Sequence, residues 1–176
     1  KGADLIVLFM HWGTEYDTIP SEDQTEMADF LFSRGADLII GSHPHVLQKM
    51  LWIKGNNEIE DRILVYSLGN FVSNQRKPKT DGGAMVRIDF TSADGKLAIK
   101  NAGFYLTWVY TPIVKYRKQY YILPCSRFEN MPEFFSKTED YGLMKKFIND
   151  SRDLLNSQNV GFKEFIYSGN RWILNE

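Results

Sequence analysis

Two short stretches of the chain share a pattern that restricts the folds open to it. Residues 2–11 read GADLIVLFMH, and residues 35–45 read GADLIIGSHPH. Each begins with Gly-Ala-Asp, continues with a run of apolar, β-favouring residues and ends in histidine. Because both runs are apolar at consecutive positions, they predict strands that are covered on both faces, as in a parallel sheet. We expect residues 5–10 and 38–40 to be buried strands of one such sheet.

The residues between the two stretches predict a helix. Pro20 suits the first turn, Gly35 stands where a left-handed C-cap belongs, and apolar residues recur between them at helical spacing (Met27, Phe30 and Leu31). By analogy, Gly2 would cap a helix that precedes residue 1. We therefore expect the chain to be the C-terminal portion of a longer protein.

The middle third of the chain favours antiparallel strands. Strand-like segments are separated by turn sequences such as KGNN, TDGG and ADG, and they cover residues 46–53, 62–68, 84–90, 96–110 and 119–124. The segment 96–110 is long for one strand, so Asn101-Ala102-Gly103 is expected to form a β-bulge.

The last part predicts a helix preceded by a loop. Residues 127–135 favour the loop, and residues 136–158 have a helical pattern in which Ser136 and Glu139 match a capping box. The fold class is therefore α/β (α+β), with parallel strands, an antiparallel meander and a C-terminal helix. We expect a single domain over residues 1–176 with three parts: an α/β part that bears the motifs, a mainly antiparallel part and a helical tail, over residues 1–73, 74–135 and 136–176.

Charge and cysteine content exclude several classes. The formal net charge of -1 gives no electrostatic case for a nucleic acid or an anionic membrane as partner. The single cysteine, Cys125, excludes an intramolecular disulfide framework and a cysteine-based zinc site. No apolar run is long enough to span a bilayer, and no signal peptide is visible.

The three histidines of the chain are the strongest candidates for a functional site. His11, His43 and His45 all lie just past the C-terminal ends of the two predicted parallel strands. Ligands bind at this edge of open α/β sheets, and histidine is the commonest metal ligand. Pro44 favours an extended conformation at His43, which would point both imidazoles of the His-Pro-His segment the same way.

Two other interpretations of the histidines stay open. They could be loop residues that only make hydrogen bonds. Ser42 precedes His43, but a serine hydrolase is the weaker option because the chain has no G-x-S-x-G elbow.

Two polar residues near the histidines complete the candidate set. Glu15, in HWGTEY, could be a metal ligand, an acid or base, or a partner that fixes an imidazole tautomer; the alternative is an exposed loop carboxylate. Asn70, in YSLGNF, follows a third strand and could bind a phosphate or orient a loop; the alternative is an ordinary turn residue.

Three motifs in order, HWGTEY, GADLIIGSHPHVLQ and VYSLGNFV, give residues 1–73 a specific resemblance. They resemble the C-terminal half of the bacterial capsule-synthesis CapA (poly-γ-glutamate synthesis, PGA_cap) family, which belongs with the calcineurin-like metallophosphoesterases. The resemblance implies the C-terminal part of an α/β/β/α sandwich with a two-metal centre at the strand ends. By the resemblance, His11 and His43 would bind one ion and His45 the other. The residues themselves make Glu15 and Asn70 the predicted catalytic side chains.

The chain lacks the Asp-x-His, Gly-Asp and Asn-His motifs of that superfamily. The resemblance therefore implies that it supplies half of a site for divalent ions (Mn, Zn or Fe), which activates water for phosphoester hydrolysis in the full-length protein. We expect the isolated chain to bind metal weakly and to be inactive.

The resemblance also implies partners and a location. The partners would be the missing N-terminal half of the same protein, a capsule polymer or phosphoester substrate, and a second copy through exposed strand edges. The protein would lie on the extracytoplasmic face of the bacterial cell membrane, anchored by an N-terminal segment. The alternatives are a non-catalytic scaffold or polymer-handling subunit of capsule synthesis or export, and a stand-alone small domain.

Overall fold

The computed structural model describes residues 2–56, 60–93 and 96–175 and shows an α+β fold, as the sequence predicts. A four-stranded sheet has the order β1-β2-β4-β3. Its elements, with the helix that connects the first two strands, are β1 (Val7–His11), α1 (Glu22–Ser33), β2 (Leu38–Ser42), β3 (Met50–Ile53) and β4 (Arg62–Val65). β1 and β4 both run parallel to β2, which confirms the expected parallel pair.

The segment 62–68 differs from the expected antiparallel meander. β4 lies beside β2 as a parallel strand, and only its other neighbour, β3, is antiparallel to it. Ile63, Leu64 and Val65 are at most 3% exposed, so this strand is covered on both faces, as is typical of the centre of a parallel sheet.

A second sheet has the order β11-β10-β6-β5, with β9 also paired to β6. Its strands are β5 (Gly82–Ala93), β6 (Lys96–Tyr110), β9 (Tyr121–Pro124), β10 (Lys163–Ser168) and β11 (Arg171–Leu174). The long segment 96–110 is one strand, and its pairing with β5 shifts register between Asp89 and Phe90. The expected irregularity is therefore present, with Lys100 as the extra residue instead of Asn101-Ala102-Gly103.

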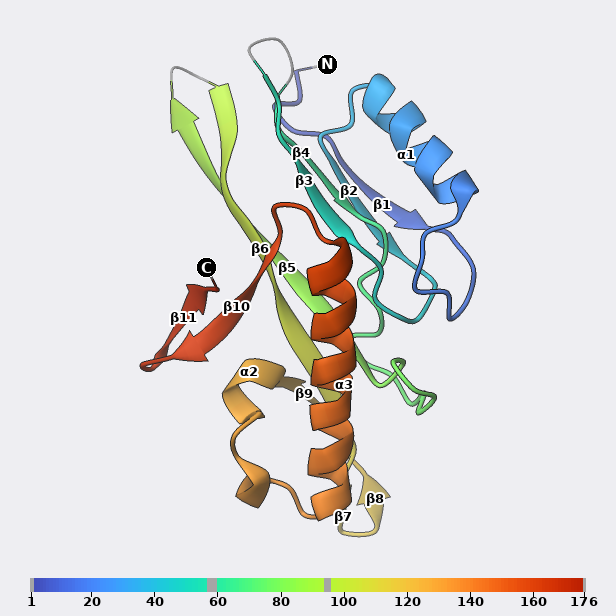
Figure 1. Cartoon of the computed structure of the whole chain (residues 1–176), viewed down its shortest axis with the longest axis vertical. Coiled ribbons are helices and arrows are strands. Elements are labelled where there is room, and N and C mark those ends of the chain that lie inside the picture. The colour runs from blue at the N-terminus through green and yellow to red at the C-terminus, as the bar shows by residue number, and fades with distance from the viewer. Residues whose placement is uncertain (1, 57–59, 94–95, 176) are drawn as a thin grey trace.

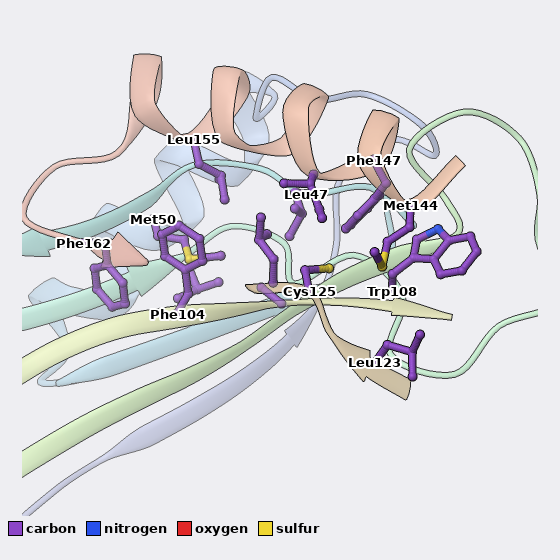
Figure 2. Close-up of a cluster of buried hydrophobic side chains, with 14 of the residues drawn as sticks. Leu47, Met50, Phe104, Trp108, Leu123, Cys125, Met144, Phe147, Leu155 and Phe162 are labelled. Carbon is purple, nitrogen blue, oxygen red and sulfur yellow. The ribbon is translucent and has the colours of Figure 1, made fainter. Parts of the chain in front are cut away.

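The main core lies between the two sheets and α3 (Thr138–Gln158) (Figures 1 and 2). It combines residues of β2 and β4 with residues of β6 and of α3, such as Ile40, Val65, Phe104, Phe147 and Leu155. The opposite face of the four-stranded sheet is covered by α1 through a smaller cluster that includes Ala28, Phe32 and Ile39.

The first strand is shorter and more exposed than the sequence predicts. Residues 5–10 were expected to form a buried strand, but β1 begins at Val7, and Val7 and Phe9 are 38% and 81% exposed. β1 is the edge strand of its sheet, and no other element among the described residues covers the face that carries these two side chains.

The helix ends also differ from expectation in detail. α1 begins after Ser21, whose side chain and that of Gln24 form a capping box, so Pro20 precedes the helix and is not in its first turn. Gly35 has the left-handed backbone expected of it, with φ of 94°. At α3 the N-cap is Lys137 without a capping box, because Ser136 instead exchanges hydrogen bonds with the hydroxyl of Tyr110.

Two C-terminal segments have a different secondary structure from the predicted one. Residues 127–135 are not a simple loop, since α2 (Cys125–Phe128) and the 3-10 helix η1 (Pro132–Phe134) occupy most of this region. The expected helical tail over residues 136–176 ends at Gln158, and β10 and β11 follow as a hairpin.

A buried carboxylate in this core leads to a prediction about pH. Asp81 is 8% exposed, and its Oδ2 accepts a hydrogen bond of 2.7 Å from Trp108 Nε1. Burial raises the pKa of Asp81 above its usual range, and the bond from Trp108 offsets this in part. Because the folded state then holds the proton more tightly than the unfolded state, stability falls as pH rises from the ordinary pKa to the raised one.

We expect Asp81→Asn, which keeps an acceptor for Trp108, to remove this decline and to be more stable than the parent at pH 7. Urea unfolding between pH 3.5 and 7 measures the effect, with Asp153→Asn as an exposed control. An unchanged slope in Asp81→Asn would show that this carboxyl does not cause the decline.

Candidate functional site

The three histidines converge at one edge of the four-stranded sheet. His11 is the last residue of β1 and lies in register with Ser42, the last residue of β2. The ring centroids of His11 and His43 are 4.4 Å apart, and those of His43 and His45 are 6.1 Å apart. The structure therefore brings together the residues that the sequence placed at neighbouring strand ends.

The backbone of the His-Pro-His segment is not the extended one that Pro44 was expected to favour. His43 and His45 have φ values of 108° and 63°, which L-residues rarely adopt. The loop is a series of bends. The prediction that an extended backbone points both imidazoles the same way is therefore wrong. Such conformations are costly, and in folded proteins they gather at functional sites.

Gly41 and Trp12 hold the strand ends close together. Trp12 Nε1 donates a hydrogen bond of 2.9 Å to the carbonyl oxygen of Tyr66, and the two rings stack. A Cβ atom on Gly41 would collide with this same carbonyl and with the Trp12 indole. The motifs do not predict this arrangement, although a glycine within a buried strand is a known signal of close backbone approach.

His45 has a defined hydrogen-bond partner at Nδ1. Its Nδ1 lies 3.0 Å from Asn70 Oδ1, while Asn70 Nδ2 donates to the carbonyl of Thr80 at 2.8 Å. Because the amide nitrogen is used by Thr80, its oxygen faces the imidazole, and His45 must donate through Nδ1. In this tautomer Nε2 carries the lone pair through which an imidazole binds a metal.

Glu15 lies on the Nε2 side of His45. Its Oε1 is 3.5 Å from Nε2, and the Glu15 side chain is 52% exposed. Glu15 and Asn70 therefore both contact the same imidazole, and in the described part of the chain neither forms a hydrogen bond with the close pair His11 and His43. Their catalytic roles stay a prediction.

Tyr16 and Lys77 extend the site beyond the expected residues. The Tyr16 ring centroid lies 6.0 Å from that of His45, and Lys77 Nζ lies 4.0 Å from the Tyr16 ring centroid. Lys77 lies in the loop after β4. The strand pattern of the sequence does not predict that this loop reaches Tyr16.

The donors of this site suit a metal ion only in part. In residues 2–56, 60–93 and 96–175, no group of three His, Cys, Asp or Glu side chains is arranged to hold one. His11 and His43 are close enough to share an ion, whereas His45 is turned toward Asn70 and Glu15. These residues fit part of a metal centre and do not fit a complete one.

Comparison with known proteins finds a similarity for the first part of the chain. The sequence model of the family "Bacterial capsule synthesis protein PGA_cap" matches residues 1–75. Residues 1–75, which are less than half of the 176 residues, are therefore similar to this capsule synthesis family. The PGA_cap region therefore contains all three histidines together with Glu15 and Asn70, and it confirms the resemblance seen over residues 1–73.

Two curated relatives agree with the PGA_cap assignment. "PGA biosynthesis protein CapA" of Bacillus subtilis (strain 168) is 40% identical over 87 residues, which is 49% of this chain. "Capsule biosynthesis protein CapA" of Bacillus anthracis is 44% identical over 85 residues, or 48% of this chain. The matches span only 21% and 19% of the length of these two relatives. Among the described residues of this chain, no helix is long and apolar enough to cross a membrane.

Proposed function

We propose that this chain is part of a capsule or poly-γ-glutamate biosynthesis protein. The proposal is supported by the PGA_cap match over residues 1–75 and by two relatives named for capsule or PGA biosynthesis. We further propose that His11, His43 and His45 contribute ligands to a divalent-metal site of the phosphoesterase type. The remaining ligands would come from protein outside these 176 residues.

The observation that carries the metal proposal is the convergence of the three histidines. The chain has no other histidine, yet all three lie at one sheet edge, with rings 4.4 Å and 6.1 Å apart. The strained backbone at His43 and His45 supports a functional role, because ordinary loop residues do not need it. The hydrogen bond to Asn70 fixes the His45 tautomer that a metal ligand requires.

A non-catalytic scaffold or polymer-handling subunit is the second candidate. It is favoured by one observation, namely that the described residues contain no complete set of three donors. The two candidates differ in whether the histidines bind a metal at all.

Zinc-dependent stabilisation of the chain tests the metal proposal. A ligand that binds only the folded state raises the free energy of unfolding, by about 1.4 kcal/mol when free zinc is tenfold above its Kd. We expect this response in the parent chain, its loss in His43→Gln, and its reduction in His45→Gln. Asp17→Asn, an exposed change in the same loop region, serves as the control and should respond like the parent.

Two results would count against the proposal. Equal stabilisation of the parent and His43→Gln, or no stabilisation of either, would favour the scaffold. Turnover of an aryl phosphate by the chain alone, abolished by His43→Ala, would show that the site needs no further ligands.

A further inference from the structure

Two loop segments beside the histidine site, which meet it at Lys77, carry a concentrated positive charge. Residues 71–79 read FVSNQRKPK and residues 111–121 read TPIVKYRKQYY, and neither segment contains an acidic residue. Together they contain six cationic side chains: Arg76, Lys77, Lys79, Lys115, Arg117 and Lys118. The whole-chain charge of -1, which gave no case for an anionic partner, hides this local excess.

The two segments form one surface. Asn74 Oδ1 accepts hydrogen bonds of 3.0 Å from both Lys118 Nζ and Tyr120 Oη, so residues 71–79 are bound to residues 111–121. Among the described residues, no acidic side chain forms an ion pair with any of the six cations. We call residues 71–79 and 111–121 the basic-aromatic surface.

The same surface exposes large apolar side chains. Tyr116 is fully exposed, Ile113 is 71% exposed and Val72 is 64% exposed. Other members are also exposed: Phe71, Val114, Tyr120 and Tyr121. Exposed aliphatic and aromatic groups beside unpaired cations are unusual on a surface that faces only water.

The strands β7 (Ile113–Val114) and β8 (Arg117–Lys118) form a hairpin within this surface, with Ile113 opposite Lys118 and Val114 opposite Arg117. Both pairs are exposed, so neither face of the hairpin is covered. Figure 1 shows the hairpin at one end of the longest axis of the molecule. It is therefore a projecting element and not part of a groove.

The turn of this hairpin has an unfavourable sequence. Lys115 and Tyr116 have φ values of 49° and 64°, the left-handed pair that a two-residue turn requires. Asn-Gly or a similar pair normally fills these positions, because a Lys or Tyr pays a conformational cost there. A long cation and an exposed aromatic ring at the tip indicate that their side chains have a role outside the fold.

We propose that the basic-aromatic surface docks on an anionic lipid bilayer, with the tip of the β7–β8 hairpin entering the headgroup region. Lysine and arginine near a bilayer are attracted to anionic headgroups. Tyrosine and aliphatic side chains gain by entering the interface beside them. This contact goes beyond the metal proposal and does not depend on it.

The apolar side chains favour a bilayer over a dissolved anionic polymer. A polymer such as polyglutamate would be held by the cations alone, and it would leave Ile113 and Tyr116 of the hairpin without a partner. The position of the hairpin at one end of the molecule also lets its tip meet a flat surface. The two partners therefore differ in whether apolar substitutions at the tip weaken binding.

Co-sedimentation of the 176-residue chain with vesicles tests the proposal. We expect binding to phosphatidylglycerol–phosphatidylcholine vesicles (1:1), weakening as salt rises, and little binding to pure phosphatidylcholine. Each Lys or Arg near the surface contributes about fivefold in affinity, so replacing Lys115, Arg117 and Lys118 by serine should weaken binding on the order of 100-fold. Ile113→Ser with Tyr116→Ser should weaken it about tenfold with the charge unchanged.

A charge-matched control removes three exposed cations from the second sheet, with serine at Lys100, Lys163 and Arg171. It should bind like the parent, and circular dichroism should show all variants folded. The proposal is overturned by equal losses in the control and the hairpin variants, or by no binding to anionic vesicles. Binding of soluble polyglutamate, without vesicle binding and without an effect of Ile113→Ser and Tyr116→Ser, would assign the surface to a polymer instead.

Discussion

Arg152→Ala is expected to lower the free energy of unfolding by about 3 kcal/mol, because it leaves the buried Glu164 carboxylate without a cationic partner and Glu129 with only Lys145, whose Nζ lies 3.9 Å away. Arg152, in α3, binds Glu129 through Nη1 and Nη2 at 2.7 Å and 3.0 Å. It also binds Glu164, in β10, through Nε and Nη2 at 2.7 Å and 3.1 Å. The Glu164 and Glu129 side chains are only 6% and 15% exposed, so water cannot replace the lost bonds fully.

The pKa of Arg152 agrees with its role as a partner of both carboxylates. Burial lowers the pKa of Arg152, but hydrogen bonds and charge attraction from Glu129 and Glu164 raise it overall. One guanidinium therefore joins the segment after α2, the helix α3 and the strand β10. Lysine cannot make both forked contacts, so Arg152→Lys should also destabilise the chain.

The matched control is an ion pair on the same helix. Lys146 Nζ lies 2.7 Å from Asp150 Oδ2, but the Lys146 side chain is 64% exposed. Lys146→Ala should change stability by about 0.5 kcal/mol or less. Urea unfolding of both variants gives the comparison, and a cost for Arg152→Ala no larger than that of Lys146→Ala would show that the network does not stabilise the fold. Combining Arg152→Met with Glu129→Gln and Glu164→Gln should recover part of the loss.

Gly41→Ala is the second substitution with a large expected effect. A Cβ atom at Gly41 would collide with the backbone carbonyl of Tyr66, so β2 and β4 must separate. The Trp12 indole, which donates to that carbonyl, would be displaced as well. We expect destabilisation of about 3 kcal/mol, the upper part of the range for overpacked interiors.

Gly142→Ala provides the opposite case for comparison. Gly142 lies within α3, and a Cβ atom there would have no neighbour within 4 Å. Alanine should therefore stabilise the helix, by about 0.5–1 kcal/mol. Equal effects of the two substitutions on urea unfolding would contradict the role given to Gly41, as would a zinc response of Gly41→Ala identical to that of the parent.

The sequence was informative where local pattern and chain order decide the structure. The buried run of β2, the cap at Gly35 and the convergence of the histidines followed from apolar runs and from the edge at which parallel strands end. The exposure of Phe9 did not follow, because it depends on which strand lies at the sheet edge.

Contacts between distant segments explain the other differences. Asn70 meets His45 because β4 lies next to β2, and a sequence read without the strand order cannot establish this. The positive φ of His43 opposes the local preference before proline, so packing around the strand ends overrides it. The β10–β11 hairpin, in contrast, did have a local signal, since Gly169 and Asn170 form its two-residue turn.

Nitrogen-15 spectra of the imidazoles give the most direct test of the central claim, because all three histidines of the chain lie in the candidate site. The spectra of the chain without metal should show His45 protonated at Nδ1. On titration with zinc, we predict that the ring nitrogens of His11 and His43 shift together and saturate, and that His43→Gln removes the shift at His11. Imidazole signals that do not respond to zinc, or a His11 response that persists in His43→Gln, would contradict the claim that these residues form one side of a metal site.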